Sequence, residues 1–248
     1  MISTLFHAII YNPIYNGLVF FVDLLPTHDI GIAVVIVTVI VRLILFPLSR
    51  RAIKAQMGMK ALAPEIEALK KKYKDNPQEH SRALFALYRE RDVHPFAGFL
   101  VLVVQIPILL GLYWVFARAG FPTVHADLLY SFVPMPHAVN MEFLGLVNMG
   151  GKSIVLAMLA ALTQLIYTRL SMGPRGSQTP VEAVESSFSA DMAKSFDLQA
   201  RYVLPIVVGV IAYTVAAAAP LYWVTSNIFM IAQEYLSGRR FNGIKKDA

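Results

Sequence analysis

One cationic residue lies inside an otherwise apolar run of this 248-residue chain: Arg42, within residues 30–48. Such a run is long enough to cross a bilayer, since about 20 apolar residues span it. A charge at that depth costs at least about 2–3 kcal/mol, so it should face protein or water rather than lipid. Thr38 precedes Arg42 by four residues and shares its helix face. We expect a hydrated site in the membrane where Arg42 attracts an acidic group; the alternative is that its long side chain reaches the aqueous boundary.

Uncharged polar and aromatic residues in the other apolar runs could line the same site. Taken singly, each is more often a packing contact between helices. We count no Asp or Glu within the membrane, so Arg42 is predicted to have no acidic partner there, and water or a passing acidic group would have to solvate it. The candidates are Gln105, Gln164, Tyr222, Trp223, Ser226 and Asn227.

Catalytic and metal-binding chemistry finds no support in the residues. The chain has no cysteine, and its six histidines are scattered without the spacing of a metal site. Ser226 has no plausible base within the membrane, and no glycine-rich loop could hold a phosphate. We therefore expect no catalytic residues, no metal, no cofactor and no enzymatic activity.

The elements that must position Arg42 are membrane-spanning helices. The chain is 56% hydrophobic and 15% charged, whereas a soluble domain carries about 25% charged residues. An all-α membrane protein with five spans follows, and Pro220 separates the last two as a tight hairpin. The predicted spans are 30–48, 96–117, 151–170, 203–219 and 221–237.

Two further helical segments are predicted outside the spans. Residues 1–29 contain no Lys or Arg and are interrupted by two Pro and a Gly. They fit an amphipathic helix that lies on the external face of the membrane. Residues 50–95 read as a helical hairpin that turns at Asp75-Asn76-Pro77. This hairpin is either a docking arm or a solvated spacer, and its periodicity does not decide between them.

Charge predicts the orientation of the chain. The segment 50–95, the loop 171–202 with Arg169 on its flank, and the basic tail 238–248 hold 19 Lys and Arg, whereas the loop 118–150 and its flank hold two. By the positive-inside rule, the N-terminus lies outside and the C-terminus in the cytoplasm. The net charge of +6 then reflects topology and lipid headgroups. We expect no direct recognition of nucleic acid.

Four segments together resemble the YidC family of membrane protein insertases, which is related to the mitochondrial and thylakoid insertases. They are VTVIVRLILFPLSRRAIKAQ, MKALAPEIEALKKKYKDNPQ, HPFAGFLVLVVQIPILLGLYWVF and PLYWVTSNIFMIAQEYL, in this order along the chain. The resemblance implies five helices around a hydrophilic groove that is open to the cytoplasm and the lipid. It also implies that Arg42, Thr38, Gln105, Gln164 and Trp223 line this groove.

The resemblance further implies a chaperone that inserts nascent membrane proteins without nucleotide hydrolysis. The lack of a transit peptide and the short ends favour a bacterial plasma membrane. Implied partners are nascent chains, the lipid bilayer, the Sec translocon, the signal-recognition pathway and the ribosome. The tail SGRRFNGIKKDA is short and basic, so we expect no stable ribosome docking through it. A small polytopic transporter or channel is the main alternative, and a passive assembly scaffold is another; five spans without an internal repeat speak against a transporter.

Overall fold

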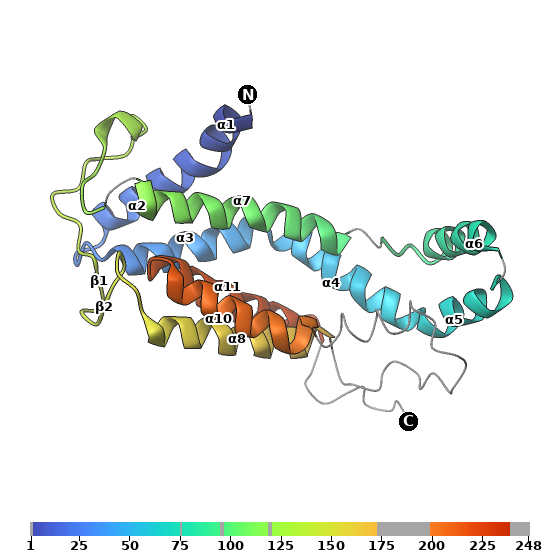
Figure 1. The fold of residues 1–248 in the computed structure, drawn as a ribbon. Helices are drawn as coiled ribbons and strands as arrows, with labels where there is room; N and C mark the ends of the chain where they lie inside the picture. The colour runs from blue at the N-terminus through green and yellow to red at the C-terminus, as the bar shows by residue number, and fades with distance from the viewer. Residues whose placement is uncertain (1, 75, 95–96, 119–120, 173–198, 239–248) are drawn as a thin grey trace.

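The computed structural model describes residues 2–74, 76–94, 97–118, 121–172 and 199–238. The predicted loop 171–202 and tail 238–248 lie mostly outside these residues, as does Asp75 of the predicted hairpin turn. Helices dominate the described part (Figure 1). The elements are α1 (Ile2–Phe6), the π-helix η1 (His7–Tyr11), α2 (Asn12–Leu24), α3 (Ile30–Ile44), α4 (Phe46–Ala61), α5 (Ala63–Lys72), α6 (Pro77–Glu90), α7 (Ala97–Arg118), the 3-10 helix η2 (Ala126–Leu128), β1 (Glu142–Phe143), β2 (Val147–Asn148), α8 (Ile154–Met172), the π-helix η3 (Gln199–Val203), α10 (Leu204–Thr214) and α11 (Ala218–Leu236).

The number of helices that meet a length and hydropathy requirement for crossing a membrane is smaller than five. Thr4–Leu24 and Ile154–Met172 meet it, and the bent pair Ile30–Ile44 with Phe46–Met59 would make a third. The apolar part of α7 and the η3–α10 segment are shorter. The described part of the chain is thus a helical membrane protein with two or three span candidates, and five spans stay a prediction.

The N-terminal segment is continuously helical from α1 through α2, although Pro13 and Gly17 were expected to interrupt it. Pro13 follows directly on the π-helix η1, a locally widened turn that accommodates a residue without an N–H inside the continuous helix. Tyr15, Leu18 and Val22 on α2 are fully buried in the core that α2 shares with α3 and α7. Figure 1 shows α1 and α2 inclined to α7. Their place at the outer membrane surface stays a prediction, because this segment is also long and apolar enough to span.

The first predicted span bends before its expected end. α3 ends at Ile44, α4 starts at Phe46, and the two axes differ by 61°. Pro47 explains the break, because it has no N–H to donate to the carbonyl of Leu43 and its ring clashes with that turn. α4 then continues away from the helix bundle toward α5 and α6 (Figure 1).

The last two predicted spans meet at a different place from the one expected. α10 ends at Thr214, Val215 is extended, and α11 already begins at Ala218. Pro220 therefore lies in the first turn of α11, where proline is tolerated, and does not separate the two helices. α8 packs along both α10 and α11 through the buried residues Ala157, Ala160, Val208, Ala212 and Val224.

The segment between α7 and α8 is held against the start of α3 by Asp29. This carboxylate is 2% exposed and caps α3 by accepting from the backbone N–H groups of Gly31 (2.7 Å) and Ile32 (3.1 Å). Its second oxygen accepts from the N–H of Leu144 at 2.8 Å, in the turn between β1 and β2. Phe143 packs so closely on Gly31 that a Cβ there would lie 2.4 Å from its ring. The β-hairpin is thereby fixed at one end of the bundle, opposite α5 and α6 (Figure 1).

Candidate functional site

Arg42 lies in the last turn of α3 and is buried against α11. Its side chain is 5% exposed, and its Nε donates to Ser226 Oγ at 2.6 Å. Its Nη2 donates to the same hydroxyl oxygen. Within the described residues, no Asp or Glu forms an ion pair with Arg42. A buried cation is thus held by a neutral acceptor, which leaves its charge uncompensated locally.

Thr38 lies one turn before Arg42 and is 2% exposed. Its hydroxyl donates to the carbonyl of Val34 at 2.6 Å, in its own helix. Beside it is a cavity of about 10 Å³ between α2, α3, α7 and α11, lined by apolar side chains together with Thr38 and Tyr222. This is roughly the room that one water needs. A wider hydrophilic groove stays a prediction.

Tyr222 and Gln105 join the Arg42 side of α11. Tyr222 is buried, and its hydroxyl accepts a hydrogen bond from Gln105 Nε2 across the gap between α7 and α11. Tyr222 also lines the cavity beside Thr38. The structure therefore brings five predicted site residues to one region where α3, α7 and α11 face each other: Thr38, Arg42, Gln105, Tyr222 and Ser226.

The other three predicted site residues lie toward α8. Asn227 Nδ2 donates to Thr163 Oγ1 at 3.3 Å, while Gln164 Nε2 donates to Thr168 Oγ1 within α8 at 3.3 Å. Trp223 packs against the apolar cluster of α8 and α10. Ser226 and Asn227 point to different neighbours because successive helical residues differ by about 100° in direction. Within the described part of the chain, no hydrogen bond joins Gln164, Trp223 or Asn227 to Arg42.

The sequence analysis did not single out Gln233 and Glu234, which lie in the last turns of α11. Gln233 is 3% exposed and donates to Ser49 Oγ at 2.8 Å, which ties α11 to α4 just after the bend. The pairs Arg42–Ser226 and Ser49–Gln233 are both separated by 184 residues, so α3–α4 and α11 run in parallel. The sequence feature that could have identified Gln233 is a glutamine within an apolar run, as at Gln105.

Glu234 contradicts the count of no acidic residue within the membrane. It lies inside the predicted span 221–237 and is 1% exposed. It follows Ser226 by eight residues, which places it about 12 Å farther along α11 at 1.5 Å per residue. That separation explains why it does not pair with Arg42. Within the described residues Arg42 has no acidic partner, but the predicted span 221–237 does contain a carboxylate.

Comparison with known proteins identifies the chain. Residues 21–245 match the family described as 60Kd inner membrane protein. The chain is similar to the membrane protein insertase YidC of Clostridium tetani, with 31% identity over 86% of this chain and 83% of that protein. It is also similar to the YidC insertases of Burkholderia cenocepacia (30% identity over 87% of the chain) and Methylobacillus flagellatus (28% over 86%), of which it spans 34% and 33%. The chain therefore belongs to the YidC insertase family of inner membrane proteins.

Proposed function

We propose that this chain inserts nascent membrane proteins by offering Arg42 to acidic or polar groups of a substrate segment. Family membership supports the insertase role. The observation that carries the mechanism is the environment of Arg42, a buried guanidinium whose hydrogen bonds go to a serine hydroxyl. A substrate carboxylate that replaces Ser226 would exchange a neutral acceptor for a charged one, which adds Coulombic attraction and lets two parallel N–H···O bonds reach one carboxylate.

The energetic problem that this site addresses is the passage of a short hydrophilic tail through the bilayer. Each polar group without a partner in hydrocarbon costs several kcal/mol. A hydrated groove around Arg42, Thr38 and Gln105 would shorten the dry path for that tail. The apolar span of the substrate then partitions into lipid, which makes the overall step favourable without nucleotide hydrolysis.

The groove is proposed to open where α3, α7 and α11 face each other. Gln105, Tyr222, Ser226 and Thr38 would line it around Arg42, and opening would have to part the Gln105–Tyr222 bond. Gln164, Trp223 and Asn227 would line its α8 side after a rearrangement, because their present contacts lie toward α8 and α10.

We further propose that the β-hairpin end of the bundle faces outward, while α5, α6 and the tail face the cytoplasm. The concentration of Lys and Arg in the segments 50–95 and 169–201 and in the tail supports this orientation. Partners would be nascent membrane proteins, the Sec translocon and the signal-recognition pathway, with the α5–α6 hairpin as their docking arm.

Insertion by the purified chain in liposomes tests this function. The substrate is a small protein with one span and a short acidic outer tail, and protection of the tail from added protease reports insertion. We expect protection with the chain and little without it. Arg42→Ala should lower the rate, and Arg42→Lys should retain part of it through its charge. Equal protection in empty liposomes and chain-containing liposomes would reject the insertase function.

A further inference from the structure

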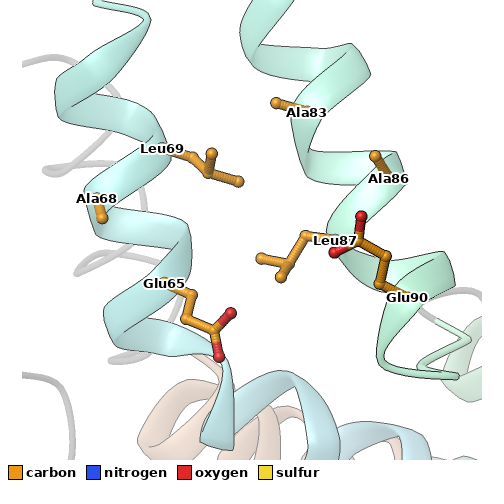
Figure 2. A pocket seen from close by; sticks show the side chains of 7 residues that line it. All are labelled: Glu65, Ala68, Leu69, Ala83, Ala86, Leu87 and Glu90. Carbon is orange, nitrogen blue, oxygen red and sulfur yellow. The ribbon is translucent and has the colours of Figure 1, made fainter.

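An apolar groove runs between α5 and α6, away from Arg42. It has a volume of about 360 Å³ and is lined by Ala68 and Leu69 of α5 and by Ala83, Ala86 and Leu87 of α6, with Glu65 and Glu90. Figure 2 shows Leu69 and Leu87 extending toward each other from opposite helices. Three of the lining residues are alanines, whose small side chains leave the space between the helices unfilled. The size falls within the 300–1,000 Å³ that binding clefts commonly have, by order of magnitude.

The two carboxylates that line the groove lie at one of its ends, the acidic end, which also carries Arg89 in the last turn of α6 and Arg91 at its C-cap. α5 and α6 are antiparallel, so Glu65 near the start of α5 and Glu90 at the end of α6 lie at the same end. Lys70, Lys71 and Lys72 lie in the last turn of α5, at the opposite end. Glu79, also near that opposite end, is paired with Arg82 at 3.2 Å. An apolar occupant with a cationic terminus would therefore bind in one direction, with that terminus beside Glu65 and Glu90.

At the acidic end of the groove, a cationic side chain of the bound segment can replace the present partner of Glu65. Glu65 forms an ion pair with Arg91 at 2.9 Å, but the two side chains are 43% and 56% exposed. Exposed pairs of this kind contribute only about 0–1 kcal/mol. An incoming Lys or Arg can replace Arg91 at little cost, and Glu90 adds a second carboxylate on the facing helix α6 (Figure 2).

We infer that this groove binds the cytoplasmic end of an apolar nascent segment, with its flanking Lys or Arg held by Glu65 and Glu90. The inference rests on the proposed insertase function. Membrane spans carry Lys and Arg on their cytoplasmic flanks, so apolar lining and carboxylates together match the chemistry of such a segment. α5 is about 15 Å long at 1.5 Å per residue, so the groove takes about half of a 20-residue span.

Peptide binding to the full-length chain in phosphatidylcholine nanodiscs tests this inference. The probes are two peptides of about ten alternating Leu and Ala residues with one photoreactive leucine, long enough for the groove. One ends in Lys-Lys and the other in Ser-Ser. We expect the Lys-Lys peptide to label α5 and α6 about fivefold more than the Ser-Ser peptide, from the upper range of exposed ion pairs. The preference should shrink at about 1 M salt, where charges are screened within about 3 Å.

Matched variants test whether the preference for the Lys-Lys peptide arises at the groove. The double variant Glu65→Gln with Glu90→Gln should abolish this preference. Glu67→Gln with Glu79→Gln removes the same charge from carboxylates that do not line the groove and should leave the preference intact. Ala68→Leu with Ala86→Leu fills the groove with good helix formers and should lower labelling by both peptides. Secondary structure by circular dichroism checks that each variant is folded.

Three outcomes would overturn the inference: an equal preference in both glutamine pairs, labelling outside α5 and α6, or photocrosslinking that assigns the groove to the chain's own residues 239–248. The liposome assay with Arg42→Ala is independent of these results. Loss of the peptide preference with intact Arg42-dependent insertion would reject only the groove. If the peptide preference holds but insertion does not depend on Arg42, only the Arg42 mechanism is rejected.

Discussion

At the residue scale, the Arg42 guanidinium has one hydrogen-bond acceptor among the described residues, the Ser226 hydroxyl. The spacing of Thr38 and Arg42 and the depth of Arg42 could be read from the sequence, because both follow from helix geometry. The partner of Arg42 could not be predicted from the sequence. Ser226 lies 184 residues away, and its contact with Arg42 depends on how α11 packs on α3.

Removing that acceptor should cost stability. We expect Ser226→Ala to lower the free energy of unfolding by about 1–3 kcal/mol, because a buried guanidinium loses its acceptor. Thermal unfolding of the detergent-solubilised protein measures this. Thr225→Ala is the matched control, since the Thr225 hydroxyl donates within its own helix to the carbonyl of Leu221. An unchanged midpoint in Ser226→Ala, equal to that of the control, would show that Arg42 does not need this acceptor.

At the element scale, helix existence was predictable and helix boundaries were less so. The apolar runs predicted α3, α7, α8, α10 and α11, because their length and composition mark helices in lipid. The junction of α10 and α11 was misplaced because the five residues before Pro220 are apolar, which hid a turn at 215–217. Glu234 was overlooked because its apolar neighbours make the whole run resemble a span.

The β-hairpin end should depend on a single carboxylate. Asp29 accepts three backbone hydrogen bonds, from Gly31, Ile32 and Leu144, and thereby joins the start of α3 to the turn between β1 and β2. We expect Asp29→Ala to cost about 2–4 kcal/mol of unfolding free energy, a lost helix cap plus an unsatisfied N–H in the turn. Hydrogen exchange should rise at residues 30–32 and 144. Asp23→Ala is the control, and equal exchange in the two variants would contradict the clamp.

At the scale of the whole molecule, helices α5 and α6 of the basic segment 50–95 and the β-hairpin lie at opposite ends of the described structure (Figure 1). The chain contains no cysteine, so single-cysteine variants report their own position without background. We expect Leu146→Cys to react with a membrane-impermeant maleimide in intact bacterial spheroplasts, and Phe85→Cys to react only in inverted vesicles. The opposite pattern would reverse the proposed orientation.

The central claim is that Arg42 acts on a negative charge in the substrate, and a double-mutant cycle measures this directly. The insertion rate is compared for an acidic outer tail and for the same tail with Asp replaced by Asn, in the unmodified chain and in Arg42→Ala. We predict that the unmodified chain prefers the acidic tail by about tenfold, a coupling within the usual range for interacting groups. The preference should disappear in Arg42→Ala. The same preference in both proteins would contradict the account.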